Sequence, residues 1–200
     1  MLYLFFKYII GPFIYLFWRP VVINRRNLRV KGKAIFVSNH ISMGDPILIA
    51  IVSPRVVHFM AKSQLFVNKI GNIFFRSMFV FPVNRRSPDT ASLKNALSLL
   101  EKGKVFGIFP EGKRTVSGEL DKLEKGAAFM AIRSGAPVIP MYIRPDSYKR
   151  LHPIMIVGKP IDISNIVANT KKSTLIDVVT DEIADSIDAL RVELEDTYCR

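Results

Sequence analysis

The chain has 200 residues, 49% of them hydrophobic, which is enough for one domain with a sizeable core. Its mean hydropathy of +0.22 is combined with a net charge of +12, and this pairing favours an anionic membrane surface, an acidic partner or an anionic substrate. Because Cys199 is the single cysteine and the three histidines lack metal-ligand spacing, we expect no internal disulfide and no metal. We also expect no cofactor.

The charge is unevenly distributed along the chain. Residues 177–200 hold eight acidic and two basic residues, whereas residues 1–176 hold 27 basic and nine acidic ones, a net charge of +18. The sequence shows no zinc-finger spacing, no RNP-like segment and no basic heptad helix, so we do not expect nucleic acid as a partner.

Residues 1–20 are the most apolar stretch. A membrane span needs about 20 apolar residues, but Lys7 interrupts this stretch, Gly11 and Pro12 break its middle, and its longest run without a charge is residues 8–18. We therefore predict that residues 1–27 form a kinked helical anchor that dips into one leaflet. The alternative is a helix packed on the protein's own core. Basic side chains that could hold anionic headgroups follow the anchor: Arg19, Arg25, Arg26, Arg29, Lys31 and Lys33.

Residues 28–172 alternate between predicted strands and helices, which indicates one α/β domain. The predicted strands are 28–30, 34–37, 56–60, 80–83, 105–109, 137–142 and 154–157. The predicted helices are 46–51, 87–102 and 126–133, and residues 64–79 mix helix and loop. Residues 173–200 are predicted to form an acidic amphipathic helix packed on the domain, because apolar residues recur at spacings of three and four: Ile176, Val179, Ile183, Ile187, Leu190 and Leu194.

The loop at residues 39–45, between a predicted strand and a predicted helix, reads NHISMGD. On a helix, His40 and Asp45 would point about 140° apart, but a loop that folds back at Gly44 would bring them together. A histidine held by a carboxylate is a general-base arrangement. Taken singly, His40 could instead be a loop histidine with its hydrogen bonds satisfied, and Asp45 only a helix N-cap.

Three clusters add cations to this pair. Residues 109–115 read FPEGKRT and follow a predicted buried strand, the usual place for a ligand in an α/β sheet. In a second cluster, Lys125 precedes Gly126 at a predicted helix start, and the N–H groups of a helix start suit a phosphate. Singly, each cation could be a solvated surface residue, but together they suit a phosphomonoester. The remaining cluster contains Lys62, Lys69, Arg76, Arg85 and Arg86.

The order and spacing of these motifs resemble the glycerolipid acyltransferase family, in particular 1-acyl-glycerol-3-phosphate acyltransferases of the bacterial PlsC type. Residues 39–45 match the family's NHxSxxD, and residues 109–114 match FPEGTR except that Lys113 replaces the threonine. Gly71 and Arg76 match a glycine–arginine motif, and residues 136–140 a proline-containing strand. A later arginine that usually follows aspartate corresponds to Arg85, which here follows Asn84.

The resemblance implies a mixed, mostly parallel sheet flanked by helices. It also implies that His40, oriented by Asp45, removes the proton from the free hydroxyl of a lysophosphatidate. Glu111 binds the glycerol part or positions the cations. Gly112 belongs to the same substrate-binding motif, and the phosphate-holding cations are Lys62, Arg76, Arg85, Lys113 and Arg114.

We expect acyl-CoA or acyl carrier protein as the acyl donor, membrane lipid as a partner, and a peripheral or monotopic location at the cytoplasmic face of the cell membrane. The Lys113 and Asn84 departures leave other acceptors open, namely glycerol 3-phosphate or another lysolipid, with a transacylase as a related possibility. The non-enzymatic alternative is a basic module that only binds anionic lipid. The sequence predicts no oligomeric state.

Overall fold

A computed structural model describes residues 2–84, 90–115, 120–150 and 152–198. Its centre is a seven-stranded sheet in the order β1-β7-β6-β2-β5-β3-β4. The pairing of β6 with β7 is antiparallel, and the other five neighbouring pairs are parallel. The sheet is therefore mixed and mostly parallel, as predicted. The strands are β1 (Val21–Ile23), β2 (Ala34–Ser38), β3 (Val57–Lys62), β4 (Val80–Val83), β5 (Val105–Ile108), β6 (Val138–Ile143) and β7 (Ile154–Val157).

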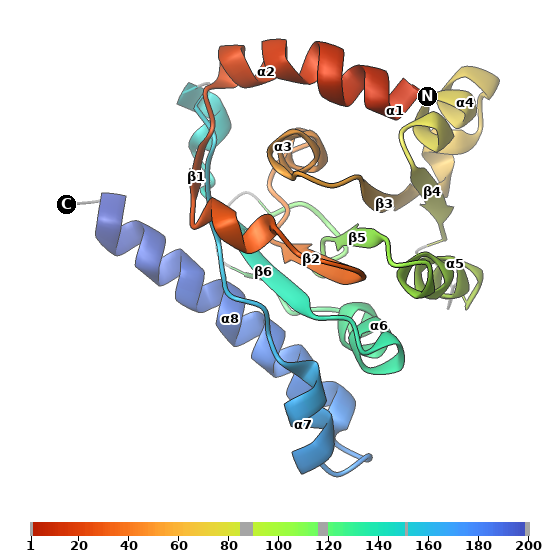
Figure 1. The fold of residues 1–200 in the computed structure, drawn as a ribbon, viewed down its shortest axis with the longest axis vertical. Helices are drawn as coiled ribbons and strands as arrows, with labels where there is room; N and C mark the ends of the chain where they lie inside the picture. Colours follow the sequence, from red (N-terminus) through yellow and green to blue (C-terminus); the bar gives the residue numbers. More distant parts are fainter. Residues whose placement is uncertain (1, 85–89, 116–119, 151, 199–200) are drawn as a thin grey trace.

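Helices cover both faces of this sheet (Figure 1). One face carries the N-terminal helical segment, α1 (Leu2–Phe5), η1 (Phe6–Ile10) and α2 (Gly11–Trp18), together with α3 (Asp45–Val52). The other face carries α5 (Thr90–Glu101), α6 (Gly126–Ser134) and α8 (Leu175–Tyr198). The remaining helices are η2 (Arg25–Leu28), η3 (Ser63–Phe66), α4 (Lys69–Ser77), η4 (Ser147–Arg150) and α7 (Ile163–Asn169).

The central strand β2 shows why the sheet has two cores. All five of its residues are buried, and successive side chains of a strand point to opposite faces. Ile35 and Val37 join the apolar cluster under α5, α6 and α8. Ala34 and Phe36 join the cluster under α3 and α2. A run of apolar residues without polar alternation is what a strand covered on both faces requires.

The predicted C-terminal stripe is confirmed, because α8 buries Val179, Ile183, Ile187, Leu190 and Leu194 against the domain. Ile176 is only partly buried at the edge of the same cluster. Two residues of the acidic face are paired within the helix: Arg191 bonds Asp188 and Glu195.

The predicted strand at residues 28–30 is wrong. Arg55 donates to the carbonyls of Val30 and Gly32, so a side chain bonds carbonyls that a strand partner would otherwise use. The first strand is instead β1, within the stretch predicted as the helical anchor, and it pairs with β7. Helix α7 was not predicted, although Asp162 caps it by accepting the N–H groups of Ser164 and Asn165.

The N-terminal segment runs as one continuous helix whose middle, η1, is π-helical. Tyr3 accepts the Val57 N–H through its hydroxyl, at 3.1 Å, and Lys7 donates to the carbonyls of Ser53 and Arg55, at 2.8 and 2.6 Å. One face therefore packs on the domain while the opposite face is exposed. No helix in the described ranges is both long and apolar enough to span a bilayer.

Truncating the Ile187 side chain tests how much the packing of α8 contributes to the free energy of unfolding. Ile187 is fully buried, so Ile187→Ala should lower the free energy of unfolding by about 2–5 kcal/mol. The measurement is urea denaturation. Val192→Ala, which truncates an exposed side chain of the same helix, should change it by less than about 0.5 kcal/mol. Equal losses in the two variants would contradict the packing described for α8.

Candidate active site

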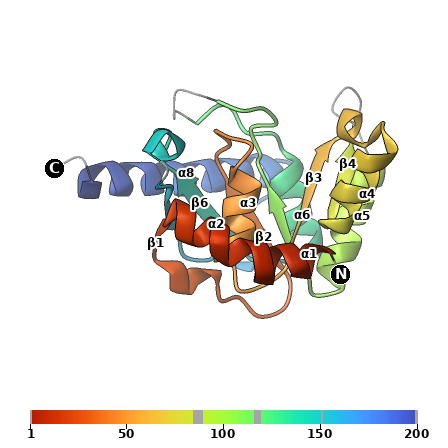
Figure 2. The same cartoon turned by 90° about the horizontal axis from the view of Figure 1, so that it is seen from above.

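The candidate site lies where the carboxyl ends of parallel strands meet. Strands β2, β5, β3 and β4 run in the same direction, so the segments that follow them leave the sheet at one edge. Figure 2 shows the loops after β2 and β5 together on that side. His40 follows β2 by two residues, and Glu111 follows β5 by three.

His40 and Asp45 form the predicted pair. His40 Nδ1 lies 2.8 Å from Asp45 Oδ2. The Asp45 side chain is fully buried, whereas that of His40 retains 14% of its exposure. Because Asp45 Oδ2 also accepts two backbone N–H bonds, Nδ1 is the proton donor in this contact, which leaves Nε2 unprotonated. No group in the described part of the chain bonds to Nε2, so that nitrogen can accept a proton from a substrate.

The loop is folded around the Asp45 carboxylate. Oδ2 accepts the N–H groups of Ile41 and Ser42, at 2.7 and 2.8 Å, and Ser42 Oγ accepts the Gly44 N–H at 3.1 Å. The interpretation of Asp45 as a plain N-cap is wrong: it is the first residue of α3, and the N–H groups it binds precede the helix.

Gly44 is needed for a reason that the sequence did not reveal. Its φ of −77° is ordinary, so the loop uses no special glycine conformation there. A Cβ at this position would lie 2.8 Å from the Tyr148 ring and 3.2 Å from Trp18. The close approach of these two rings therefore excludes a side chain.

Two further contacts fix His40. Asn39 exchanges two hydrogen bonds with the backbone of Ile143 on β6, at 2.9 and 2.8 Å. The His40 ring stacks on Phe109, with ring centroids 4.2 Å apart. No role was predicted for Asn39 or Phe109, although both lie within the motifs, because their partners are distant in sequence.

Glu111 connects the loop that follows β5 to the loop that contains His40. It is buried, and its Oε1 accepts the backbone N–H of His40 at 3.0 Å. Its Oε2 accepts Thr115 Oγ1 at 2.7 Å and the Asp121 N–H at 3.3 Å. Thr115 in turn donates its N–H to the His40 carbonyl, at 2.8 Å. Glu111 therefore joins the β5 loop to the histidine, a role that the sequence analysis did not assign to it.

The predicted cations differ in how close the structure brings them to this pair. Arg114 is exposed and immediately precedes Thr115, so its backbone lies beside His40. Lys62 is exposed at the carboxyl end of β3, on the same edge of the sheet. Lys113 pairs with Asp121 at 2.8 Å, and this hydrogen bond raises the pKa of Lys113.

The other predicted positions are Gly112, Arg76, Arg85 and Arg86. Gly112 has a φ of +67°, which explains the glycine in the FPEG motif. Arg76 donates to Asn72 at 2.6 Å and lies in the last turn of α4, which leads back to the amino end of β4. Arg76 is therefore not brought to the edge that carries His40. Arg85 and Arg86 lie outside the described residues.

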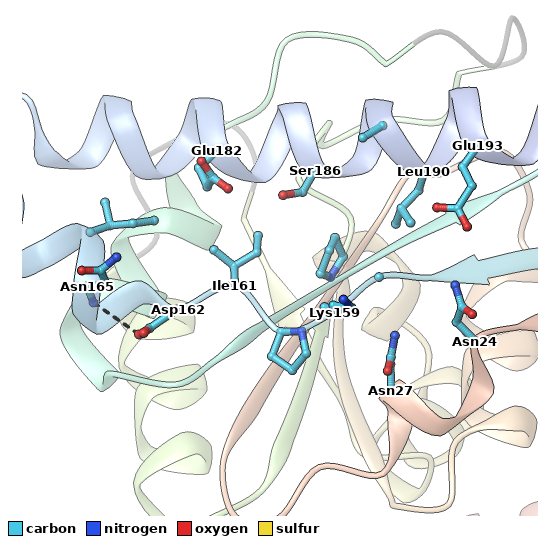
Figure 3. A pocket seen from close by; sticks show the side chains of 15 residues that line it. Asn24, Asn27, Lys159, Ile161, Asp162, Asn165, Glu182, Ser186, Leu190 and Glu193 are labelled. Atoms are coloured by element: carbon cyan, nitrogen blue, oxygen red, sulfur yellow. Dashed lines mark hydrogen bonds between the residues drawn. The ribbon is translucent and has the colours of Figure 1, made fainter.

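A cavity of about 780 Å³ lies elsewhere in the fold. It opens between α8, the segment from β7 to α7, and η2, and its lining includes Asn27, Lys159 and Glu193 (Figure 3). None of the predicted site residues lines it. Lys125, predicted as part of a phosphate-binding helix start, pairs instead with Asp177 of α8.

The fold and the pair define a class: an α/β protein with a histidine–aspartate pair at the carboxyl edge of a mixed sheet, whose histidine can accept a proton. The chain belongs to the acyltransferase family, because the model of that family matches residues 19–144. It is accordingly an acyltransferase.

Named relatives and a solved structure agree with this assignment. The chain is 34% identical over 146 residues to a 1-acyl-sn-glycerol-3-phosphate acyltransferase of Bacillus subtilis (strain 168), covering 70% of this chain and 72% of the relative. It is 25% identical over 189 residues to the enzyme of that name from Borreliella burgdorferi, covering 86% and 73%. The crystal structure of PlsC, the 1-acyl-sn-glycerophosphate (LPA) acyltransferase of Thermotoga maritima, aligns with a TM-score of 0.66 and 22% identity, covering 91% and 80%, and shows a shared fold.

Glu111→Ala should separate loop support from substrate binding. The change leaves the buried N–H groups of His40 and Asp121 without their acceptor, so the free energy of unfolding should fall by about 1–3 kcal/mol. We also expect a lower kcat with an unchanged KM for the acceptor. Urea denaturation and steady-state kinetics measure these effects.

Glu124→Ala, which truncates an exposed side chain of the same loop, is the matched control. It should change neither the free energy of unfolding nor the kinetic constants. A Glu111→Ala protein with wild-type stability and a raised acceptor KM would instead assign Glu111 to the substrate.

Proposed function

We propose that the protein transfers a fatty acyl chain from a thioester to the free hydroxyl of 1-acyl-sn-glycerol 3-phosphate, giving phosphatidate. The observation that carries the proposal is the 2.8 Å contact between His40 Nδ1 and the buried Asp45 carboxylate, with Nε2 facing no protein partner among the described residues. The names of the relatives support the choice of acceptor.

In this reaction His40 Nε2 removes the hydroxyl proton as the alkoxide oxygen attacks the thioester carbonyl carbon. The carbon–sulfur bond then breaks, and the thiolate leaves with the proton that His40 has taken. Asp45 holds the ring orientation and stabilises the imidazolium between these steps. The chain has no GxSxG elbow and its single cysteine is Cys199, which supports direct attack rather than an acyl-enzyme.

The acceptor phosphate would be held by cations at the same edge of the sheet. Arg114 and Lys62 are exposed there, and an arginine can bind two phosphate oxygens at once. Lys113 would have to leave Asp121 or share its charge with it. Arg85, which lies outside the described residues, is proposed as a further phosphate ligand from its motif position alone.

The exposed apolar surface supports the proposal that the protein attaches to a membrane; its cytoplasmic face is the expected location. The N-terminal helix and α4 are joined by a Phe6–Phe74 ring contact at 5.9 Å, so their outward faces are continuous. Such a surface suits the interface of a bilayer. We name it the apolar rim; its exposed residues are Leu4, Phe5, Tyr8, Ile9, Phe13, Leu16, Phe17, Val67, Ile70, Ile73 and Phe74.

The donor is an acyl thioester of CoA or of acyl carrier protein. Residues 1–176 carry a net charge of +18, which attracts an acidic carrier protein and an anionic CoA alike. The test is a panel of both donors against lysophosphatidate, glycerol 3-phosphate and a zwitterionic lysolipid, with product detection by mass. Phosphatidate as the main product supports the proposal; a larger yield with another acceptor overturns the choice of acceptor.

His40→Ala should lower kcat by about 10²–10⁴-fold, because the hydroxyl loses its general base. Circular dichroism should show an unchanged fold. His152→Ala removes an exposed histidine and should keep wild-type turnover. A His40→Ala protein with near-normal kcat would contradict the assignment of the base.

Phe13→Glu should detach the apolar rim from lipid. The Phe13 side chain is 70% exposed, and burying a phenylalanine contributes about 1.5–3 kcal/mol. We therefore expect at least about tenfold weaker binding to anionic vesicles in sedimentation. Val192→Glu, on α8, is the matched control and should bind normally. Unchanged binding by Phe13→Glu would rule out the apolar rim as the membrane contact.

A further inference from the structure

The Asp45 carboxylate uses only one of its two oxygens in the bonds described above. Oδ2 takes the bonds from His40, Ile41 and Ser42. Oδ1 is buried and makes no well-formed hydrogen bond with any described residue. A buried carboxylate oxygen without a donor is costly, so a group that could serve it is expected nearby.

The Tyr148 hydroxyl is such a group. It is the other side-chain polar atom that is buried without a well-formed hydrogen bond in the described chain. Tyr148 lies in η4, and its ring closely approaches Gly44, the residue before Asp45. A hydroxyl donates one hydrogen and a carboxylate oxygen accepts it, so each atom supplies what the other lacks.

The pKa of Tyr148 agrees with this placement. Burial raises the pKa of Tyr148 most, and the charge of Asp45 raises it further. A tyrosine that keeps its proton at every working pH acts as a neutral donor.

Packing holds the Tyr148 ring at this position. The ring meets Trp18, the last residue of α2, edge to face with centroids 5.6 Å apart. Gly44 lies against both rings. The end of the N-terminal helix is therefore in contact with the residue that faces Asp45.

We propose that Tyr148 is a positioning residue, whose hydroxyl donates to Asp45 Oδ1 and so fixes the carboxylate that orients His40, while Trp18 holds the Tyr148 ring in place. This inference rests on the proposed function. It adds η4 and the end of α2 to the support of the base, elements that lie outside the sequence motifs.

Tyr148→Phe removes the hydroxyl and keeps the ring. We expect kcat to fall on the order of tenfold with an unchanged acceptor KM, since only the orientation of the base is affected. The acid limb of the pH–rate profile should move to higher pH, because a carboxylate without this donor stabilises the imidazolium more strongly. The other charged group at His40 is Glu111, which bonds its backbone and is unchanged.

Histidine ring NMR gives the same test without turnover. In Tyr148→Phe the titration midpoint of His40 should rise relative to the wild type, while His58 and His152 serve as internal references. Tyr15→Phe is the matched control, because Tyr15 packs in the same apolar cluster and its hydroxyl meets Arg25 instead. It should change neither the NMR midpoint nor kcat.

The measurements distinguish a failure of the proposed function from a failure of the inference about Tyr148. A wild-type protein that transfers no acyl chain overturns the proposed function, and the NMR midpoint still decides on Tyr148. A Tyr148→Phe protein whose His40 midpoint equals that of the wild type overturns the inference, whether its activity is normal, its thermal stability is lower or only its KM is higher. A raised midpoint confined to His40 supports it.

Discussion

The buried charge of Asp45 is the constraint around which this site is built. A carboxylate removed from water costs several kcal/mol unless hydrogen bonds and opposite charge offset that cost. Here two backbone N–H groups, the positive end of α3 and the His40 ring provide the offset. The loop conformation therefore depends on the carboxylate as much as the carboxylate depends on the loop. The loop therefore holds His40 and Asp45 in their relative positions before any substrate binds.

The pair is also held from the neighbouring strand, and this depends on sheet order. Strands β2 and β5 are adjacent, so the loops that follow them meet although 71 residues separate His40 from Glu111. Glu111 takes the N–H of His40, and Thr115 gives its own N–H to the His40 carbonyl. Both polar groups of the histidine backbone are thus used, and Nε2 of the ring bonds to no described residue.

Sequence patterns predicted what depends on local spacing. The period of α8, the apolar run of β2 and the spacing of His40 and Asp45 each follow from neighbouring residues, and the structure agrees with all three. Contacts between distant segments could not be predicted in the same way. The strand expected at 28–30 is displaced by Arg55. Arg76 matched a motif, but the direction of α4 takes it to the other edge of the sheet. Gly44 is explained by rings more than 25 residues away on either side.

The N-terminal helix had two alternative predictions, a membrane anchor and a helix packed on the core, and its two faces differ in a way that bears on both. A helix that is apolar all round has no polar face to turn towards water, and this one contacts the domain on one side. Lys7, which interrupts the apolar stretch, lies on the inner side: it donates to two carbonyls of the domain, and burial lowers its pKa to about 8. The charge that argues against a membrane span therefore fastens the helix to the protein and leaves the uncharged face outward. The same helix ends at Trp18, against Tyr148, so the exposed apolar surface and the ring contact with Tyr148 belong to one helix.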